Sequence, residues 1–205
     1  MKVGDSVRKA IDDSILGDSE SSMLHACNAV DGTAKKAFPG LGVGERFTKL
    51  LRENYSVLGP MGAPGIDLLQ TRFPVKVKTK LPDSRPDLAD VIYGVHRCSH
   101  GHGDELPNGF ELLPALDGDT TVTTMKFTNG TAQLSERIIF GLLAVAVLHR
   151  VNLGQSVPDG YHLTYGSNAK LEIGEWWGRA SDFPGIVALD PPPASIRLDF
   201  GDWHN

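Results

Sequence analysis

Apolar residues recur every three or four positions through much of residues 1–153, and glycine and proline divide this repeat into blocks. Such spacing is typical of helices that bury one face. The second block, for example, ends at Pro39-Gly40, a pair that commonly follows a helix. The pattern predicts helices from Asp5 or Ser6 to Gly17, from Asp18 to Phe38, from Gly44 to Leu58, from Pro86 to Gly101 or Gly103, and from Thr131 to Asn152.

Shorter stretches that alternate apolar and polar residues lie between and after these blocks. Residues 72–80 (RFPVKVKTK) alternate in the manner of a short strand. Residues 110–128 are predicted to be extended, with a turn at Asp117-Gly118. After Gly154 the pattern predicts four β-like pieces, at 161–165, 170–173, 186–189 and 195–200.

This division predicts a mainly α (α+β) fold in which long helical blocks give way to short β-like pieces near residue 154. Residues 1–153 form the predicted helical bundle, and residues 154–205 form a small β-rich C-terminal appendage. The appendage holds all three tryptophans. We expect the adjacent Trp176 and Trp177 to pack it against the bundle rather than to stack on RNA bases.

Composition and charge narrow the class of protein. The chain has 205 residues with 20 Lys+Arg against 25 Asp+Glu, and its formal net charge of −5 excludes a uniformly basic nucleic-acid coat. Its longest apolar run, Ile138 to Leu148, is about half of the roughly 20 residues that a membrane span needs. The first residues lack the basic-then-apolar order of a signal peptide, and two cysteines give no disulfide framework. We therefore expect a cytoplasmic protein that does not associate with a membrane.

A local basic track interrupts this acidic balance between Thr71 and Pro86. Five basic residues face the single acid Asp83 there: Arg72, Lys76, Lys78, Lys80 and Arg85. Lys76, Lys78 and Lys80 alternate, so on a strand their side chains point the same way. We expect these lysines, together with Arg72, to bind the phosphates of RNA. The alternative is an edge strand whose lysines prevent aggregation.

The densest group of reactive side chains lies at residues 96–105 (HRCSHGHGDE), which hold three of the seven histidines. One interpretation is the metal site of a hydrolase, because His96 and His100 form an i, i+4 pair on one helical face. The sequence has no H-E-x-x-H motif and no paired C-x-x-C, so it assigns no metal ligand set. A second interpretation is structural, in which histidines interact with the C-terminus of the helix.

A third interpretation is acid–base cleavage of RNA by Arg97 and His102, which form an R-x4-H pattern near the predicted end of the helix. A histidine that titrates near neutrality can take the proton of the RNA 2′-hydroxyl. A permanently protonated arginine can hold the phosphate and stabilise its growing charge. On an ideal helix His102 lies about 140° around the axis from Arg97 and His100 about 60°, so His100 is the alternative base.

In these residues the chain resembles the HEPN superfamily (higher eukaryotes and prokaryotes nucleotide-binding), helical bundles whose ribonucleases carry R-x4–6-H with a polar residue after the arginine. The match is Arg97, Cys98 and His102. The segments HACNAVDGTAKK (25–36) and DVIYGVHRCSHGHGDEL (90–106) are also similar to uncharacterised bacterial proteins near that superfamily. The resemblance implies a metal-independent endoribonuclease without a cofactor, acting as a homodimer in a toxin or phage-defence (antiviral) role, with an antitoxin as a further partner.

The competing hypothesis is a non-catalytic helical module that binds a partner protein or a nucleotide. In that case Arg97 and His102 should be engaged in contacts within the chain and should not line a cleft.

Overall fold

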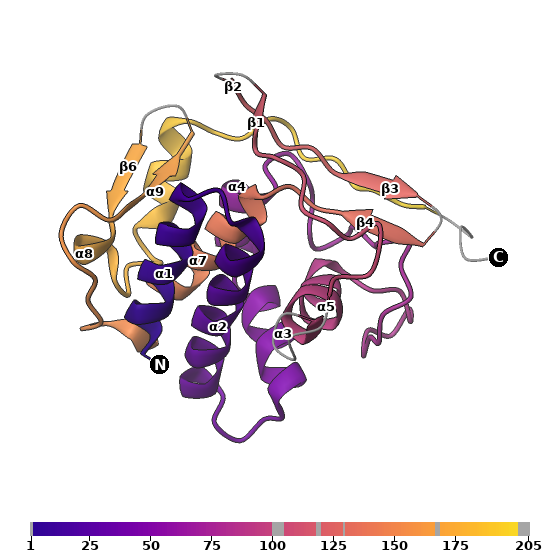
Figure 1. The fold of residues 1–205 in the computed structure, drawn as a ribbon, viewed down its shortest axis with the longest axis horizontal. Helices are drawn as coiled ribbons and strands as arrows, with labels where there is room; N and C mark the ends of the chain where they lie inside the picture. The colour runs from indigo at the N-terminus through magenta and orange to yellow at the C-terminus, as the bar shows by residue number, and fades with distance from the viewer. Residues whose placement is uncertain (1, 100–104, 118–119, 129, 167–168, 201–205) are drawn as a thin grey trace.

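The computed structural model describes residues 2–99, 105–117, 120–128, 130–166 and 169–200. The fold is mainly α-helical with small antiparallel sheets, as the sequence predicts (Figure 1). The described helices are α1 (Val3–Ile15), α2 (Ser19–Ala37), α3 (Val43–Glu53), α4 (Tyr55–Gly62), α5 (Leu88–Val91), the π-helix η1 (Ile92–Arg97), α7 (Arg137–Leu148), the 3-10 helix η2 (Arg150–Asn152), α8 (Ile173–Trp176) and α9 (Phe183–Leu189). The described strands pair as β1 (Leu116–Asp117) with β2 (Thr120–Thr121), β3 (Lys126–Thr128) with β4 (Thr131–Gln133), and β5 (His162–Tyr165) with β6 (Ala169–Glu172).

Helix α7 forms the centre of the core, and α1, α2 and α4 pack against it (Figure 1). Every residue from Gly141 to Leu148 is buried, which is typical of a helix that is apolar on all sides. α4 crosses α7 closely, since a Cβ added to Gly141 would lie 3.0 Å from the Cα of Gly62. Within the described ranges, no helix combines the length and the apolar character needed to cross a bilayer.

The break between the first two helices forms where the sequence predicts it. Gly17 adopts a positive φ of 77°, which a residue with a side chain rarely adopts. Asp18 then caps α2, because its carboxylate accepts the Ser21 N–H at 2.9 Å. The resulting turn lets α1 and α2 lie side by side (Figure 1).

Two predicted helix boundaries are wrong. The helix predicted from Gly44 to Leu58 is divided at Asn54, whose side-chain amide donates to the Leu50 carbonyl at 2.8 Å, and α4 continues past Leu58 to Gly62. The last long helix begins at Arg137 and not at Thr131, because Thr131 and its neighbours pair with β3 as strand β4. In both places a local hydrogen-bonding choice overrides the helical spacing of apolar residues.

The C-terminal prediction is partly correct. The pieces predicted at 161–165 and 170–173 form the hairpin β5–β6. The piece at 186–189 lies instead in α9, which has a proline in its first turn, a position where proline favours a helix. In the described part of 195–200 no strand forms, although Ile196 makes an isolated parallel bridge with Ile66.

The segment after α7 packs onto the helical core. The Gly178 N–H bonds to the Val147 carbonyl at 2.9 Å, and the Ala180 N–H bonds to the Leu148 carbonyl at 3.0 Å. Trp176 and Trp177 are both buried, as expected from a packing role. The third tryptophan of the appendage, Trp203, lies outside the described residues.

Candidate functional site

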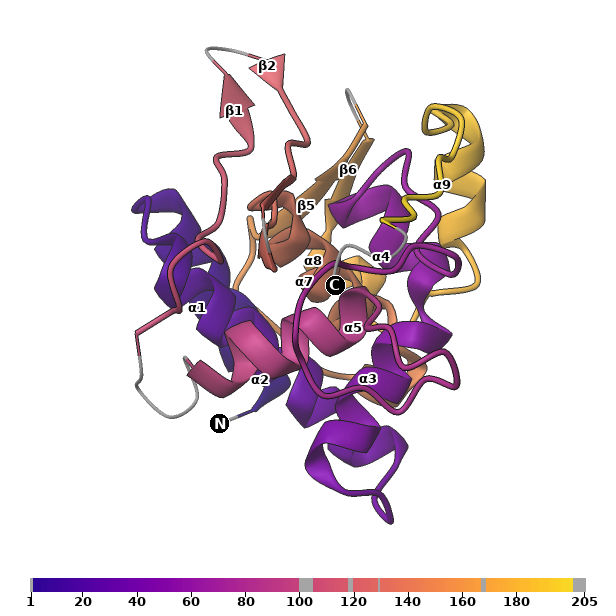
Figure 2. The ribbon, with the colours of Figure 1, turned by 90° about the vertical axis from the view of Figure 1, so that its right-hand side faces the viewer.

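A cleft of about 660 Å³ lies where η1, the extended segment 76–80 and the first turn of α3 meet. Figure 2 shows α3 beside α5, and the chain continues from α5 directly into η1. The wall of this cleft, which we call the Lys76 cleft, includes Gly44, Lys76, Lys78, Lys80, Tyr93 and Cys98.

The wall formed by η1 has an unusual backbone. Asp87 accepts the Asp90 N–H at 3.1 Å and so starts α5, as the sequence predicts. From Ile92 to Arg97 the chain widens into a π-helix, which the apolar pattern does not predict. The predicted apolar stripe is nevertheless buried: Leu88, Val91, Ile92 and Val95. π-helical turns are rare and frequently occur at functional sites.

Glycines let the walls of the cleft approach one another. A Cβ added to Gly94 would lie 3.1 Å from the Val77 Cβ, so segment 76–80 rests directly on η1. A Cβ added to Gly44 would lie 2.9 Å from the ring of Tyr93, which therefore lies against the first turn of α3. Tyr93 also packs on Phe47, with ring centroids 5.5 Å apart. These contacts hold an aromatic ring at the wall of the Lys76 cleft.

Three of the predicted RNA-binding residues lie together on this wall. Lys76, Lys78 and Lys80 are exposed, and Val77 between them is half-buried against η1. Lys80 pairs with Glu45 at 3.0 Å. Among the residues that the structure describes, no carboxylate lies within ion-pair distance of Lys76 or Lys78.

The strand predicted for residues 72–80 does not form, so the edge-strand alternative is also wrong. The alternation of exposure survives without strand pairing, because Val77 rests on Gly94 and Thr79 bonds to Asp90, while the lysines beside them are exposed. Arg72 does not line the Lys76 cleft. Its Nε donates to Asp83 at 2.7 Å, which makes Arg72 a support of the loop.

Arg97 ends η1 and contacts α2. Its Nη2 lies 3.4 Å from Asp31 Oδ2, and Arg46 holds the other oxygen of the same carboxylate at 2.9 Å. The side chain of Arg97 is 25% exposed and does not line the Lys76 cleft, although the next residue, Cys98, does. Both candidate bases lie outside the described residues: His100 and His102. The structure therefore describes the arginine of the R-x4-H pattern and not its histidine.

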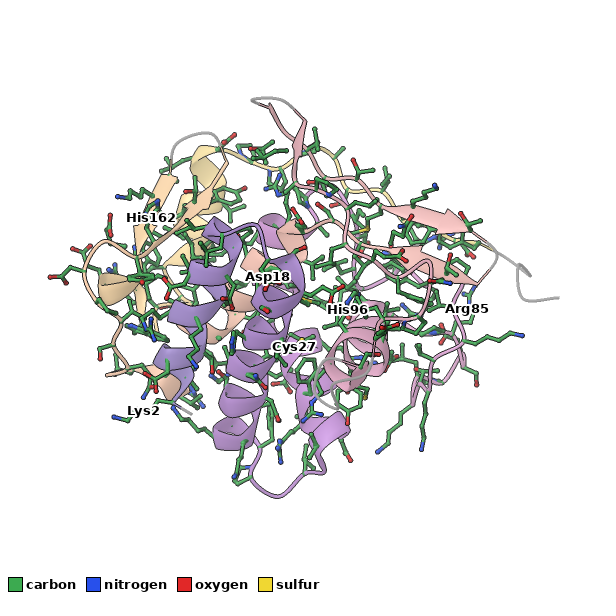
Figure 3. All side chains as sticks on the ribbon, in the orientation of Figure 1. Lys2, Asp18, Cys27, Arg85, His96 and His162 are labelled. Carbon is green, nitrogen blue, oxygen red and sulfur yellow. The ribbon has the colours of Figure 1, made fainter. Side chains whose placement is uncertain are left out.

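Cys27 and His96 lie in the interior of the protein (Figure 3). Burial raises the pKa of the Cys27 thiol to about 12, although the charge of Arg97 acts in the opposite direction. Such a thiol is protonated at neutral pH and is a poor nucleophile. For the metal interpretation, no group of three or more His, Cys, Asp or Glu side chains in the described part of the chain could hold a metal ion. The proposed second ligand, His100, lies outside that part.

An ion-pair network that the sequence analysis missed connects the walls of the cleft. Arg52, from α3, bonds to Asp87 at 2.8 and 3.0 Å, and its Nη2 lies 2.7 Å from Asp90 Oδ1. Thr79 donates to the other oxygen of Asp90 at 2.6 Å. Arg52 and Asp90 line the cleft, and both carboxylates are buried. These four residues, Arg52, Asp87, Asp90 and Thr79, form what we call the Arg52 network. It joins α3, α5 and segment 76–80 and so positions the lysines.

The two carboxyls of the Arg52 network have opposite pKa shifts. Burial alone would raise the pKa of Asp87, but the hydrogen bonds and the charge of Arg52 outweigh it and hold that pKa below its usual value. Burial raises the pKa of Asp90, and the charge of Asp87 adds to this effect, against the hydrogen bond from Thr79. The difference follows from the geometry, because Asp87 accepts two hydrogen bonds from the guanidinium.

The chain is similar to proteins from mycobacteria over its whole length. A family model described as Rv1289 matches residues 2–204. Two relatives, "Uncharacterized protein Rv1289" of Mycobacterium tuberculosis (strain ATCC 25618 / H37Rv) and "Uncharacterized protein Mb1320" of Mycobacterium bovis, are each 42% identical over 206 residues. The match covers 100% of this chain and 96% of each relative. No solved structure matches the chain. The chain therefore belongs to the Rv1289 family.

Proposed function

We propose that the protein binds single-stranded RNA at the Lys76 cleft. The observation that carries this proposal is the position of Lys76 and Lys78, which are exposed on one wall and have no acidic partner among the described residues. Uncompensated lysines at this spacing attract successive phosphates of a nucleic-acid backbone. The protein is acidic as a whole, so the attraction is local to this wall.

The other walls of the cleft suit one nucleotide of such a strand. A volume of about 660 Å³ is within the range of small-molecule sites. The ring of Tyr93, held against Gly44, offers an aromatic face to a base, and stacking of this kind tolerates any base sequence. The N-cap of α3 is Gly42, which has no side chain to cap the first N–H groups of the helix. Because Gly42, Val43 and Gly44 line the cleft, the positive end of that helix lies at its wall.

The test is binding of a short fluorescent single-stranded RNA, measured by anisotropy at several salt concentrations. The double variant Lys76→Gln/Lys78→Gln should bind about 25-fold more weakly at ~0.1 M salt. The slope of the logarithm of the binding constant against the logarithm of the salt concentration should be smaller in magnitude by about 1.4, because each single-strand phosphate contact contributes about 0.7 to it. The control is Lys2→Gln/Lys9→Gln, which removes the same charge from exposed positions at α1. Equal weakening in both double variants, or no binding by the native protein, would refute the proposal.

Cleavage of the bound RNA is a second candidate function, of the metal-independent HEPN type. The observation that favours it is the weak ion pair between Arg97 and Asp31, which is long at 3.4 Å. Arg46 already neutralises Asp31, so Arg97 can leave this pair to bind a phosphate. Arg97 would hold the scissile phosphate, and His102 or His100 would take the 2′-hydroxyl proton. We rank cleavage below binding because Arg97 is engaged within the chain and does not line the cleft. A homodimer, an antitoxin and a toxin or phage-defence role depend on this second candidate.

The cleavage test is incubation of RNA with the protein in EDTA, beside Arg97→Gln, His102→Ala and His100→Ala. Cleavage that survives the chelator and is lost in Arg97→Gln and in one histidine variant would support the nuclease, with 2′,3′-cyclic phosphate and 5′-hydroxyl products. Arg150→Gln is the control, because it removes an exposed arginine that does not contact Arg97 or Asp31 and should keep the activity. Intact RNA in the presence of demonstrated binding would refute cleavage and leave the binding proposal standing.

A further inference from the structure

A second cleft, of about 670 Å³, lies between α1, the β1–β2 hairpin, the first turn of α7 and β5. The hairpin projects from the top of the molecule in both views (Figures 1 and 2). We call this the Arg137 cleft, and it shares no lining residue with the Lys76 cleft. Much of its wall is apolar: Ile11, Ile15, Met61, Leu116, Phe140 and Leu163.

Arg137 contributes a positive charge to this apolar wall. Its side chain is half-buried, and Nη1 donates to Thr123 Oγ1 at 3.2 Å. In the described parts of the chain, no carboxylate lies within 4.0 Å of the guanidinium. A guanidinium has five N–H donors, and within the described residues the bond to Thr123 engages only one of them. Burial lowers the pKa of Arg137, because the charged form is less favourable away from water.

Three acids line the same wall, and two of them accept hydrogen bonds from other residues. Asp12 accepts hydrogen bonds from Arg8 at 2.8 Å and from the Tyr161 hydroxyl at 2.6 Å. Glu136 accepts the N–H of Ala115 at 3.3 Å. A third acid, Asp159, is exposed at the surface, where water screens its charge. Within the described residues, the half-buried guanidinium of Arg137 therefore has no ion-pair partner, and neither has the half-buried carboxylate of Glu136 beside it.

The cleft also has apolar residues at its mouth that the fold leaves in water. Ile15 is 78% exposed and Leu116 is 64% exposed, and both line the cleft. Covering such side chains with an apolar ligand is favourable, at roughly 25 cal/mol for each Å² removed from water. A ligand that pairs with Arg137 and also covers these apolar side chains therefore has an anionic head and an apolar body.

We propose that the Arg137 cleft binds an organic anion with an aliphatic chain, its head group on Arg137 and its chain between α1 and Phe140. A carboxylate and a phosphate monoester share this chemistry, since both accept two parallel N–H bonds from a guanidinium. This site is independent of the proposed RNA binding, because its residues come from different elements.

The test is calorimetric titration of the native protein with decanoate and with decyl phosphate, below the concentrations at which they form micelles. The tighter of the two identifies the head group. Decanol and decyltrimethylammonium have the same chain without the negative charge, and acetate has the charge without the chain. All three should bind at least about tenfold more weakly. Decanol and decyltrimethylammonium lose the charge-assisted hydrogen bonds to Arg137, and acetate loses the burial of the chain.

Substitutions then locate the site. Arg137→Gln should weaken the chain anion by at least about tenfold and leave decanol unchanged, and Arg137→Lys should give an intermediate loss. Arg150→Gln, an exposed arginine just beyond the other end of α7, is the control and should bind as the native protein does. The proposal is overturned if neither anion binds, if decyltrimethylammonium binds as tightly as decanoate, or if Arg137→Gln and Arg150→Gln lose the same affinity.

Discussion

Replacing Arg52 with methionine should destabilise the protein, because Arg52 is the cation that neutralises two buried carboxylates. Its guanidinium makes bonds of 2.8 and 3.0 Å to Asp87 and lies 2.7 Å from Asp90. Methionine keeps the apolar stem and removes the charge and the donors. The Arg52 network also joins the walls of the Lys76 cleft, so the same substitution should weaken RNA binding.

The expected loss follows from the burial of the three groups. Removing one partner of a buried ion pair costs about 3–5 kcal/mol, since a charge is left without compensation. The Arg52 side chain is 25% exposed, so water can approach the site, and we expect the lower value of about 3 kcal/mol. The triple variant Arg52→Met/Asp87→Asn/Asp90→Asn leaves no charge unpaired and should lose less than the single variant. Asparagine at position 87 can still cap α5.

The assay is urea unfolding followed by tryptophan fluorescence, near neutral pH and at about pH 5. In the native protein the folded pKa of Asp87 is lowered, so its contribution is present above the unfolded value of about 3.9 and is lost as the pH falls through the folded pKa. Without Arg52, burial raises the pKa of both carboxyls, and the folded state then takes up protons more readily than the unfolded state. The destabilisation by Arg52→Met should therefore be largest at neutral pH and should shrink on acidification. A loss below about 1 kcal/mol at neutral pH, or a loss that grows on acidification, would refute this reasoning.

Two further predictions concern packing and thiol reactivity. Gly141→Ala should lower the free energy of unfolding by about 1–3 kcal/mol, because the added Cβ would lie 3.0 Å from the Cα of Gly62. Gly185→Ala in α9 meets nothing within 4 Å and should be neutral or stabilise by up to about 1 kcal/mol, so equal losses in urea unfolding would contradict the helix crossing. Iodoacetamide should label half-buried Cys98 in the folded protein and Cys27 only after unfolding, because burial raises the pKa of Cys27 to about 12. Mass spectrometry reads both sites, and labelling of Cys27 at the rate of Cys98 would show that this part of the core opens.

Part of the candidate site could be predicted from local sequence. The alternation of Lys76, Lys78 and Lys80 places their side chains on one side of any extended segment, whether or not it pairs as a strand. The start of α5, which continues into η1, can likewise be predicted locally, because the Asp87 carboxylate bonds to an N–H only three residues away. The role of His100 and His102 stays a prediction, since both lie outside the described residues.

The remaining features of the site depend on distant partners. Arg52 meets Asp87 across 35 positions of sequence, and nothing in the spacing shows which of the 20 Lys and Arg residues neutralises that acid. The contact of Gly44 with Tyr93 is also set by the packing of α3 on η1. Arg97 is a similar case, because its ion pair with Asp31 depends on how η1 lies against α2.

The sequence by itself determined the mainly helical class, the break at Gly17-Asp18 and the buried stripe from Leu88 to Val95, because each depends on residues within one or two helical turns. Only the tertiary structure decided that Arg52 neutralises Asp87 and Asp90, and that residues 72–80 run extended without a strand partner. A backbone N–H or a buried charge must find its partner wherever the packed chain brings one. That choice is made by contacts between remote segments, which the spacing of apolar residues does not record.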